Sequence, residues 1–278
     1  MDRLLIVDGN SLLYRGYFAT TESISRTTGG EYINAVVAFD NMLKKAIKIF
    51  NPTHLLVVFD KGKDSFRFKL FPDYKANRPD PPLDLVPQFK LVRDYLDASN
   101  IKWTESEKYE ADDLIGSLTK QWFVEYAILT SDRDLLQLTD FLTTIYLMKH
   151  GLTEYKECNE EYFLKEYDGL RPEQLIDYKA LVGDKSDNVP GVAGIGDKTA
   201  KNLLVQYGSC DEIYKNLDSL SKGTKSKLEK GKEDCYFSKQ LVTIKTDINV
   251  KPDLESLRLN IDKVKRSIFY EKHEMPEI

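Results

Sequence analysis

Histidine, cysteine and long hydrophobic runs are scarce in this sequence, and each shortage excludes a class of protein. The 278 residues include three histidines and three cysteines. No histidine lies in an acidic motif, so we expect neither a histidine base nor a zinc site. No two cysteines have the spacing of metal ligands, and such a sparse, odd count is typical of a reducing, cytoplasmic location.

The hydrophobic residues make up 41% of the chain but never form a long run. The first run, Leu4 to Val7, is too short for a signal-peptide core or a membrane span, so we expect no membrane association. The composition fits one large globular domain or two small ones. Neither a G-x-S-x-G elbow nor a Walker A loop is present. The net charge of −5 argues at first against a nucleic-acid partner.

Three apolar runs each lead into an aspartate: "LLIVDGN" to Asp8, "HLLVVFD" to Asp60 and "YAILTSD" to Asp132. Short, non-alternating runs of this kind predict strands buried on both faces of a parallel sheet. Apolar residues at helical spacing predict helices over 35–50, 85–96 and 112–122 between them. Alternation of strand and helix predicts an α/β fold with a mostly parallel central sheet and flanking helices.

From about residue 159 the pattern is helical throughout. We predict helices over 160–167, 172–182 and 198–207, followed by short charged helices. The predicted organisation is a core over 1–158, a helical region over 159–250 and a charged tail over 251–278. The tail is weakly patterned, so we expect it to be partly mobile and assign it no function.

Nine acidic residues lie at predicted strand ends, helix starts or loops. A single aspartate there is often a turn residue or a helix cap. Three at equivalent strand ends favour a shared site, because ligands of open α/β sheets bind at the carboxyl ends of the strands. The candidates for metal ligation are Asp8, Asp60, Glu110, Asp112, Asp113, Asp132, Asp134, Asp184 and Asp187.

Carboxylates gathered in one cleft repel each other and need neutralising cations. Oxygen ligands favour hard divalent ions, and Mg²⁺, with Mn²⁺ as a substitute, suits phosphate chemistry. We therefore hypothesise a phosphodiesterase that uses two Mg²⁺ ions, one activating water and one stabilising the leaving oxygen.

A glycine-rich turn follows the last pair of acids. "GVAGIGDKTAKNLL" contains Gly191, Gly194 and Gly196 and leads into a helix that carries Lys198 and Lys201. Free backbone N–H groups at a helix start bind anions, so this element is expected to contact DNA phosphates. The alternative is a plain loop before a helix. Since "GVAGIG" follows no predicted strand, it does not indicate a dinucleotide site.

A second segment, "DSFRFKLFPDYKANRPDPP", mixes basic and aromatic residues. Such a mixture can neutralise a strand and stack its bases, which makes Arg67, Tyr74, Lys75 and Arg78 candidate DNA contacts. For the phenylalanines we favour inward packing instead. Setting the nine clustered acids aside leaves 36 acids against 40 lysines and arginines. The remainder of the chain is thus slightly basic, and the acidic total does not exclude DNA.

These motifs resemble the bacterial 5′–3′ exonuclease and flap endonuclease family, which includes the nuclease domain of DNA polymerase I and free-standing relatives. The similar stretches are "VDGNSLLYR", "VVFD", "SFRFKLFPDYKANR", "YEADD", "LTSDRDLLQL" and "GDKSDNVPGVAGIGDKTA". They extend from about residue 4 to about residue 247, in order. The chain has no polymerase or proofreading motif, so we expect a free-standing enzyme or an excised domain.

The resemblance implies a PIN-like core with a helical arch at about 61–90 and a helix–three-turn–helix (helix-hairpin-helix) element at about 183–207. It implies cleavage of 5′ flaps and 5′ ends near junctions of single-stranded and duplex DNA, with 5′-phosphate and 3′-hydroxyl products. By motif, the first metal site would comprise Asp8, Asp60, Glu110 and Asp112, and the second Asp132, Asp134, Asp184 and Asp187, with Asp113 near both.

The resemblance also implies roles for basic residues and partners. Lys75 and Arg78 match arch residues that steer the scissile phosphate, Tyr74 would stack a base, and Arg15 lies near the substrate strand. K⁺ at the turn carbonyls is a further implication. The expected partners are flapped, forked, nicked or gapped DNA, with RNA–DNA primers included, and a monomeric enzyme acting in DNA replication and repair.

Three other functions stay open at this stage. A DNA-structure binder with an inactive site would not need the complete acid set. A PIN-type ribonuclease would not need the arch and the glycine-rich turn. A phosphatase with Asp8 as nucleophile would want an acid two residues later, where the sequence has Asn10.

Overall fold

The computed structural model describes residues 1–22, 25–150 and 154–276. Its centre is a six-stranded sheet in the order β3-β2-β1-β4-β5-β6. The strands are β1 (Arg3–Asp8), β2 (His54–Asp60), β3 (Lys102–Ser106), β4 (Glu125–Thr130), β5 (Thr143–His150) and β6 (Glu154–Cys158). The first five are parallel and β6 pairs antiparallel to β5. The predicted α/β class with a mostly parallel sheet is confirmed.

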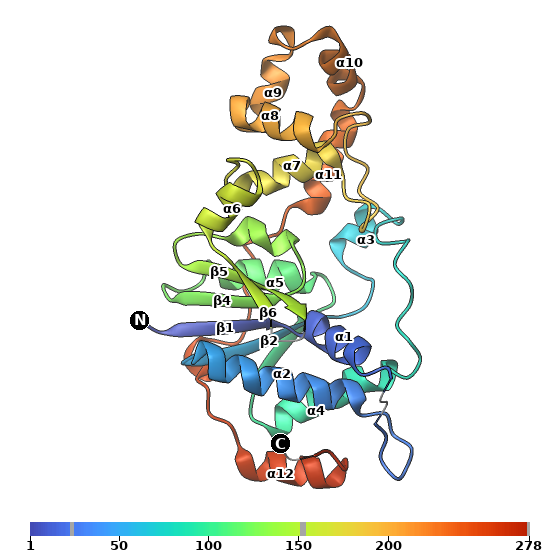
Figure 1. Ribbon diagram of the computed structural model, residues 1–278, viewed down its shortest axis with the longest axis vertical. Coiled ribbons are helices and arrows are strands. Elements are labelled where there is room, and N and C mark those ends of the chain that lie inside the picture. The colour runs from blue at the N-terminus through green and yellow to red at the C-terminus, as the bar shows by residue number, and fades with distance from the viewer. Residues whose placement is uncertain (23–24, 151–153, 277–278) are drawn as a thin grey trace.

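Helices cover both faces of the sheet, as Figure 1 shows. On one face lie α1 (Gly9–Ala19), α2 (Asn34–Phe50) and α4 (Val86–Ala98), which bury residues against Leu5, Val7 and Val57. On the other face α5 (Ala111–Leu118) packs on Ile6 and Val58. Alternate residues of each buried strand therefore pack into two different hydrophobic cores, one on each face of the sheet, because side chains of a strand point alternately to its two faces.

The helical region lies at the top of Figure 1, above β4, β5 and α5 in this view. Its elements are α6 (Glu160–Glu166), η2 (Pro172–Gln174), α7 (Leu175–Val182), α8 (Asp197–Tyr207), α9 (Cys210–Lys215), η3 (Leu217–Ser219), α10 (Lys222–Lys230) and α11 (Lys232–Val242). One hydrophobic core runs without interruption from strand residues Ile6 and Ile128 to Leu181 and Leu204 of these helices. The helical region is thus fixed to the sheet.

Two segments differ from the sequence-based expectation in detail. Between residue 61 and the start of α4 at Val86, the predicted arch segment contains one short helix, α3 (Phe66–Leu70), followed by turns and an extended, proline-rich stretch. The predicted charged tail contains η4 (Glu255–Leu257) and a helix, α12 (Lys263–Lys272), whose Phe269 and Tyr270 are buried against α4. Within the described residues, no helix has the length and apolar character needed to cross a membrane.

Candidate active site

Three aspartates lie where β1, β2 and β4 end, along one edge of the sheet. Asp8 is only 6% exposed and caps α1 by accepting hydrogen bonds from the Ser11 backbone N (2.9 Å) and the Ser11 hydroxyl (2.6 Å). The Thr130 hydroxyl donates a third bond at 2.8 Å. Asp60 accepts from the Ala111 backbone N at 2.7 Å, and this bond brings the first turn of α5 to the end of β2.

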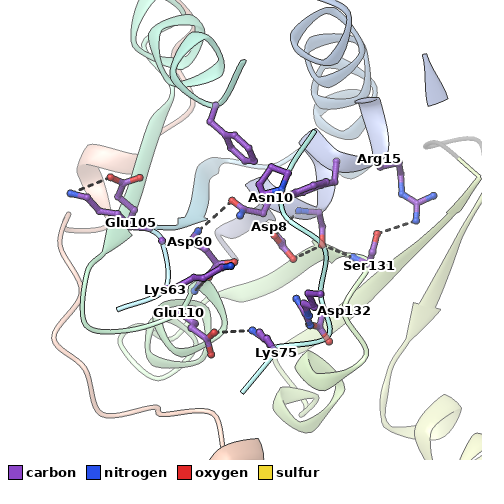
Figure 2. A pocket seen from close by; sticks show the side chains of 18 of the residues that line it. Asp8, Asn10, Arg15, Asp60, Lys63, Lys75, Glu105, Glu110, Ser131 and Asp132 are labelled. Atoms are coloured by element: carbon purple, nitrogen blue, oxygen red, sulfur yellow. Dashed lines mark hydrogen bonds and ion pairs between the residues drawn. The ribbon is translucent and has the colours of Figure 1, made fainter. Parts of the chain in front are cut away.

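A cleft of about 1530 Å³ opens at this edge and is lined by five of the nine predicted acids: Asp8, Asp60, Glu110, Asp112 and Asp132. Figure 2 labels Asp8, Asp60, Glu110 and Asp132, whose side chains lie around the same space. A second cavity of about 560 Å³ is lined by Asp132, Asp134 and Asp184. Asp132 lines both, so the two cavities adjoin at the end of β4.

Burial raises the pKa of several of these carboxyl groups. It raises the pKa of Asp60 to about 6, against the lowering influence of Lys75. Burial and the negative charge of Asp132 raise the pKa of Asp134 to about 6 and that of Asp112 well above its ordinary value. The pKa of Asp8 is also raised by burial. These carboxylates lack enough positive charge around them, which marks a functional site more often than a structural one.

Lysine and arginine side chains form ion pairs with Glu110, Asp134, Asp184 and Asp187. Lys75 donates to Glu110 at 2.8 Å, and Arg78 pairs with Asp187. Lys179 contacts both Asp134 and, at 2.5 Å, Asp184. Among the described residues, no three acidic, histidine or cysteine side chains are grouped so that they would hold a metal ion as they stand. The all-oxygen donor set and the raised pKa values nevertheless fit a hard divalent ion.

Asp113 does not fit its predicted place near both metal sites. Its side chain is fully buried, lines neither cavity and forms a two-pronged ion pair with Arg67 at 2.6 and 2.8 Å. It also accepts from the Glu110 and Lys245 backbone N–H groups. All these bonds lie inside the protein, and Asp113 therefore acts as a structural residue here.

Arg67 and Tyr74 were predicted as DNA contacts, and their burial corrects this. Arg67 is 3% exposed, and its guanidinium donates to Asp113, Glu110 and two backbone carbonyls. Tyr74 is 5% exposed, and its hydroxyl lies 3.3 Å from both a Glu110 and an Asp187 oxygen. Neither side chain has a free face for a nucleic-acid strand.

The other predicted contacts of the cleft are accessible. Lys75, Arg78 and Arg15 all line the large cleft. The Arg15 guanidinium donates to the Ser131 hydroxyl and the Met148 carbonyl, both at 3.0 Å, and to the Lys149 carbonyl. Arg15 thereby joins α1 to the ends of β4 and β5. In Figure 2, Arg15 and Lys75 lie on separate sides of the acidic cluster.

The glycine-rich turn lies between α7 and α8, directly after the acidic loop. Gly191 is buried and donates from its backbone N to the Ser238 hydroxyl at 2.9 Å, whereas Gly194 and Gly196 are exposed. Lys198 is exposed at the start of α8. Lys201 is partly buried and pairs with Asp168 (2.9 Å) and Asp197 (3.1 Å). The turn thus presents backbone at Gly194 and Gly196, and the start of α8 adds the exposed Lys198 side chain.

Sequence reasoning missed Lys179, Ser11 and Thr130. Lys179 lies on α7, five residues before Asp184, and no local sequence pattern distinguishes it. Ser11 and Thr130 hold Asp8 through hydroxyl groups, for which the sequence carries no distinctive pattern.

Comparison with known proteins gives two family models that together cover most of the chain. Residues 3–168 match "5′-3′ exonuclease, N-terminal resolvase-like domain", and residues 170–265 match "5′-3′ exonuclease, C-terminal SAM fold". The chain therefore belongs to the 5′–3′ exonuclease family. The resemblance inferred from the motifs is confirmed.

The curated proteins that this chain resembles include bacterial DNA polymerases I. That of Bacillus subtilis is 41% identical over 259 residues, which is 92% of this chain and 29% of the relative. That of Streptococcus pneumoniae strain R6 is 40% identical over 261 residues, 92% of this chain and 30% of the relative. The chain thus spans about 30% of the length of the curated relatives that it matches.

Solved structures of similar fold include two of the T5 D15 protein. One was co-crystallised with metal ions (TM-score 0.72, 21% identity, 98% of both chains). The other is a variant described as a flap endonuclease pseudo-enzyme–product complex with DNA and metal ions (TM-score 0.73, 22% identity, 98% of this chain and 99% of the other). At this identity they establish the shared fold.

Proposed function

We propose that this nuclease cleaves phosphodiester bonds of DNA near junctions of single strand and duplex, acting on 5′ ends and 5′ flaps in a divalent-metal-dependent reaction. The observation that carries the proposal is the cleft at the ends of β1, β2 and β4, where five carboxylates face one space and burial raises the pKa of three of them, Asp8, Asp60 and Asp112. The substrate classes are flapped, forked, nicked and gapped duplexes, with RNA–DNA primers included. Replication and repair are the corresponding cellular roles for a monomer.

The chain's own residues divide into holding and positioning groups. Asp8, Asp60, Glu110 and Asp112 would hold one ion, and Asp132, Asp134, Asp184 and Asp187 a second. Such ions supply Lewis acidity for hydrolysis when bound. Lys75 and Arg78, which now neutralise Glu110 and Asp187, are close enough to the cleft to bind the scissile phosphate instead.

Duplex binding belongs to the turn before α8. Its exposed glycines let the backbone approach a phosphate, and the start of α8 adds N–H groups and the Lys198 side chain. Lys227 donates to the Gly194 carbonyl at 3.1 Å, so a lysine ammonium group already contacts one of the turn carbonyls for which K⁺ was predicted. Binding of K⁺ there and a cytoplasmic location remain predictions.

Replacement of one acid tests the proposal. We expect Asp184→Asn to reduce the single-turnover rate on a labelled 5′-flap DNA with Mg²⁺ by at least ~100-fold, the order lost when one electrostatic component of a preorganised site is removed. Flap binding should stay within about threefold, because the turn supplies the phosphate contacts. Asp218→Asn, whose side chain is 97% exposed on the helical region, is the matched control. Full cleavage by Asp184→Asn would refute the second ion site.

A further inference from the structure

The segment that carries Lys75 and Arg78 is joined to the acidic loop before the glycine-rich turn. We call residues 71–78 the strap and residues 184–190 the acidic loop. Figure 1 shows the chain after α7 descending beside the chain that follows α3. Three hydrogen bonds to backbone carbonyls connect them: Lys75 N to the Asp187 carbonyl (3.0 Å), Asn77 Nδ2 to the Lys185 carbonyl (2.6 Å) and Asn188 Nδ2 to the Asp73 carbonyl (2.9 Å).

Apolar contacts reinforce this connection. Phe71 packs edge-on against Phe237 of α11, with ring centroids 5.4 Å apart. Tyr74 is buried in a small core with Val189 and Leu241. The strap follows β2 and α3 in the chain, but it packs on the helical region, whose residues Phe237 and Leu241 are far from it in sequence.

The acidic loop has little freedom to move independently of the turn. Asp184 and Val189 exchange backbone hydrogen bonds of 2.8 and 2.9 Å, which close the loop. Two residues after Val189, Gly191 N is held by Ser238, and Val192 N donates to the Leu181 carbonyl at 2.8 Å. A displacement of the turn is thus passed to the loop, and from the loop to the strap.

We propose that Asn77 and Asn188 are positioning residues, which couple duplex binding at the glycine-rich turn to the placement of Lys75 and Arg78 over the cleft. The inference rests on the proposed function and adds to it the reason why cleavage would occur at a fixed offset from the duplex. Neither asparagine contacts the cleft, and both side chains are exposed, so they act through the strap.

The hydrogen bonds donated by the Asn77 and Asn188 side chains are suited to this task because donor and acceptor are both neutral. The ion pairs of Arg78 and Lys75 with Asp187 also hold the strap, but their carboxylate is one of the proposed metal ligands. An ion bound by Asp187 would compete with these ion pairs. The bonds from Asn77 and Asn188 go to backbone carbonyls, so an ion at Asp187 would not compete for them.

The backbone conformation at Asn188 allows its side chain to be removed without strain. Its φ of +60° lies in the left-handed region, so Asn188→Gly removes the amide without straining the loop. Asn100 provides a matched control, because its φ is +55° and its Nδ2 donates to the Asn260 carbonyl at 2.8 Å, at the end of α4. Asn100→Gly makes the same chemical change away from the cleft.

The first measurement is single-turnover cleavage of a 5′-flap DNA by the full chain at saturating enzyme. For the double variant Asn77→Ala/Asn188→Gly we expect a rate lower by roughly 10- to 100-fold, the order that misplacement by about 1 Å produces. Cuts should spread to neighbouring linkages, while affinity for a blunt duplex stays within about twofold and Asn100→Gly matches the unmodified protein. An unchanged rate and cut position in the double variant would overturn the coupling.

The second measurement does not depend on cleavage. Hydrogen exchange is followed over residues 73–78, with and without a flap-free duplex and in EDTA. Duplex binding should slow exchange of the strap in the unmodified protein and in Asn100→Gly, and have no effect on the strap in the double variant. Equal protection of the strap in all three proteins would refute the inference. If the unmodified protein fails to cut any flap, the proposed function fails, but this comparison still decides the coupling.

Discussion

Arg67 shows how far the role of a single residue depends on contacts that are remote in sequence. It lies among basic and aromatic residues, which locally predict a nucleic-acid contact. Its guanidinium instead donates to the Leu241 and Thr243 carbonyls and to the carboxylates of Glu110 and Asp113. Burial acts to lower its pKa, but the hydrogen bonds and charge of Asp113 raise the pKa overall. Arg67 thus ties α3 to α5 and to the segment that follows α11.

Removal of this guanidinium should destabilise the fold. We expect Arg67→Met to lower the free energy of unfolding by about 3–5 kcal/mol, because a buried Asp113 carboxylate would lose its partner. Lys69→Met, which changes an exposed side chain two residues away, should change it by less than about 0.5 kcal/mol. Urea unfolding in EDTA measures both variants. A marginal effect of Arg67→Met, with a specific loss of DNA affinity, would restore the original interpretation as a DNA contact.

At the scale of elements, the turn between α7 and α8 depends on two glycines that touch. Gly183 and Gly191 have φ values of +79° and +64°. A Cβ on Gly191 would come within 2.3 Å of the Gly183 backbone N, where no side-chain movement could relieve the clash. Gly196, by contrast, has a φ of −105° and open space around its Cα.

Alanine substitutions at Gly191 and Gly196 should therefore differ. We expect Gly191→Ala to destabilise the protein by roughly 2 kcal/mol or more, because it combines backbone strain with overpacking. It should also weaken duplex binding, since the turn would move. Gly196→Ala should keep the melting temperature, although its added methyl group lies on the proposed phosphate face. Thermal unfolding and duplex titrations of the two variants separate these effects, and equal melting temperatures would contradict the packing argument.

The accuracy of the sequence-based fold depends on where each strand lies in the sheet. The three predicted strands, β1, β2 and β4, are central, buried on both faces and continuously apolar. The missed strands β3 and β6 are the edges, and their sequences, KWTES and EYKEC, are polar because one side faces solvent. Strand β5 was missed although it contains a short apolar run, Ile145 to Met148, after its two threonines.

The candidate site likewise has residues that could be predicted from the sequence and residues that could not. The acids at strand ends could be predicted because parallel strands bring their carboxyl ends to one edge of the sheet. The cations that neutralise them could not. Lys179 meets Asp134, 45 positions away, where the helical region packs on the sheet. Arg67 of α3 meets Asp113 of α5, 46 positions away. Such pairings depend on tertiary structure, for which single residues carry no local pattern.

At the scale of the whole molecule, the two faces of the sheet pack against different parts of the chain. One core joins the sheet to the helical region, and the other is completed by α12. The Asp40 carboxylate accepts from the hydroxyls of Tyr95 at 2.6 Å and Tyr270 at 2.9 Å, so it fastens α12 to α2 and α4. The acids of the site come from the strand ends and from the helical region, which share one core, and metal binding at the site should therefore stabilise the entire chain.

This coupling predicts how metal and pH act together on thermal unfolding. The folded-state pKa of about 6 for Asp60 and Asp134 exceeds the ordinary value of 3.8, so the folded protein binds these protons more tightly than the unfolded chain. Their stabilising contribution is present at low pH and is lost as the pH rises through 6. In EDTA, the melting temperature of the unmodified protein should therefore fall, relative to that of Asp134→Asn, between about pH 5 and about pH 7.5.

Mg²⁺ should raise the melting temperature of the unmodified protein by about 3 °C or more at the higher pH, which is the effect of ~1 kcal/mol in a protein of this size. At the lower pH, Mg²⁺ should raise it by little. The Mg²⁺ effect should shrink in Asp134→Asn and persist in Asp218→Asn. An equal response to Mg²⁺ at both pH values would mean that the ion does not bind to these carboxylates.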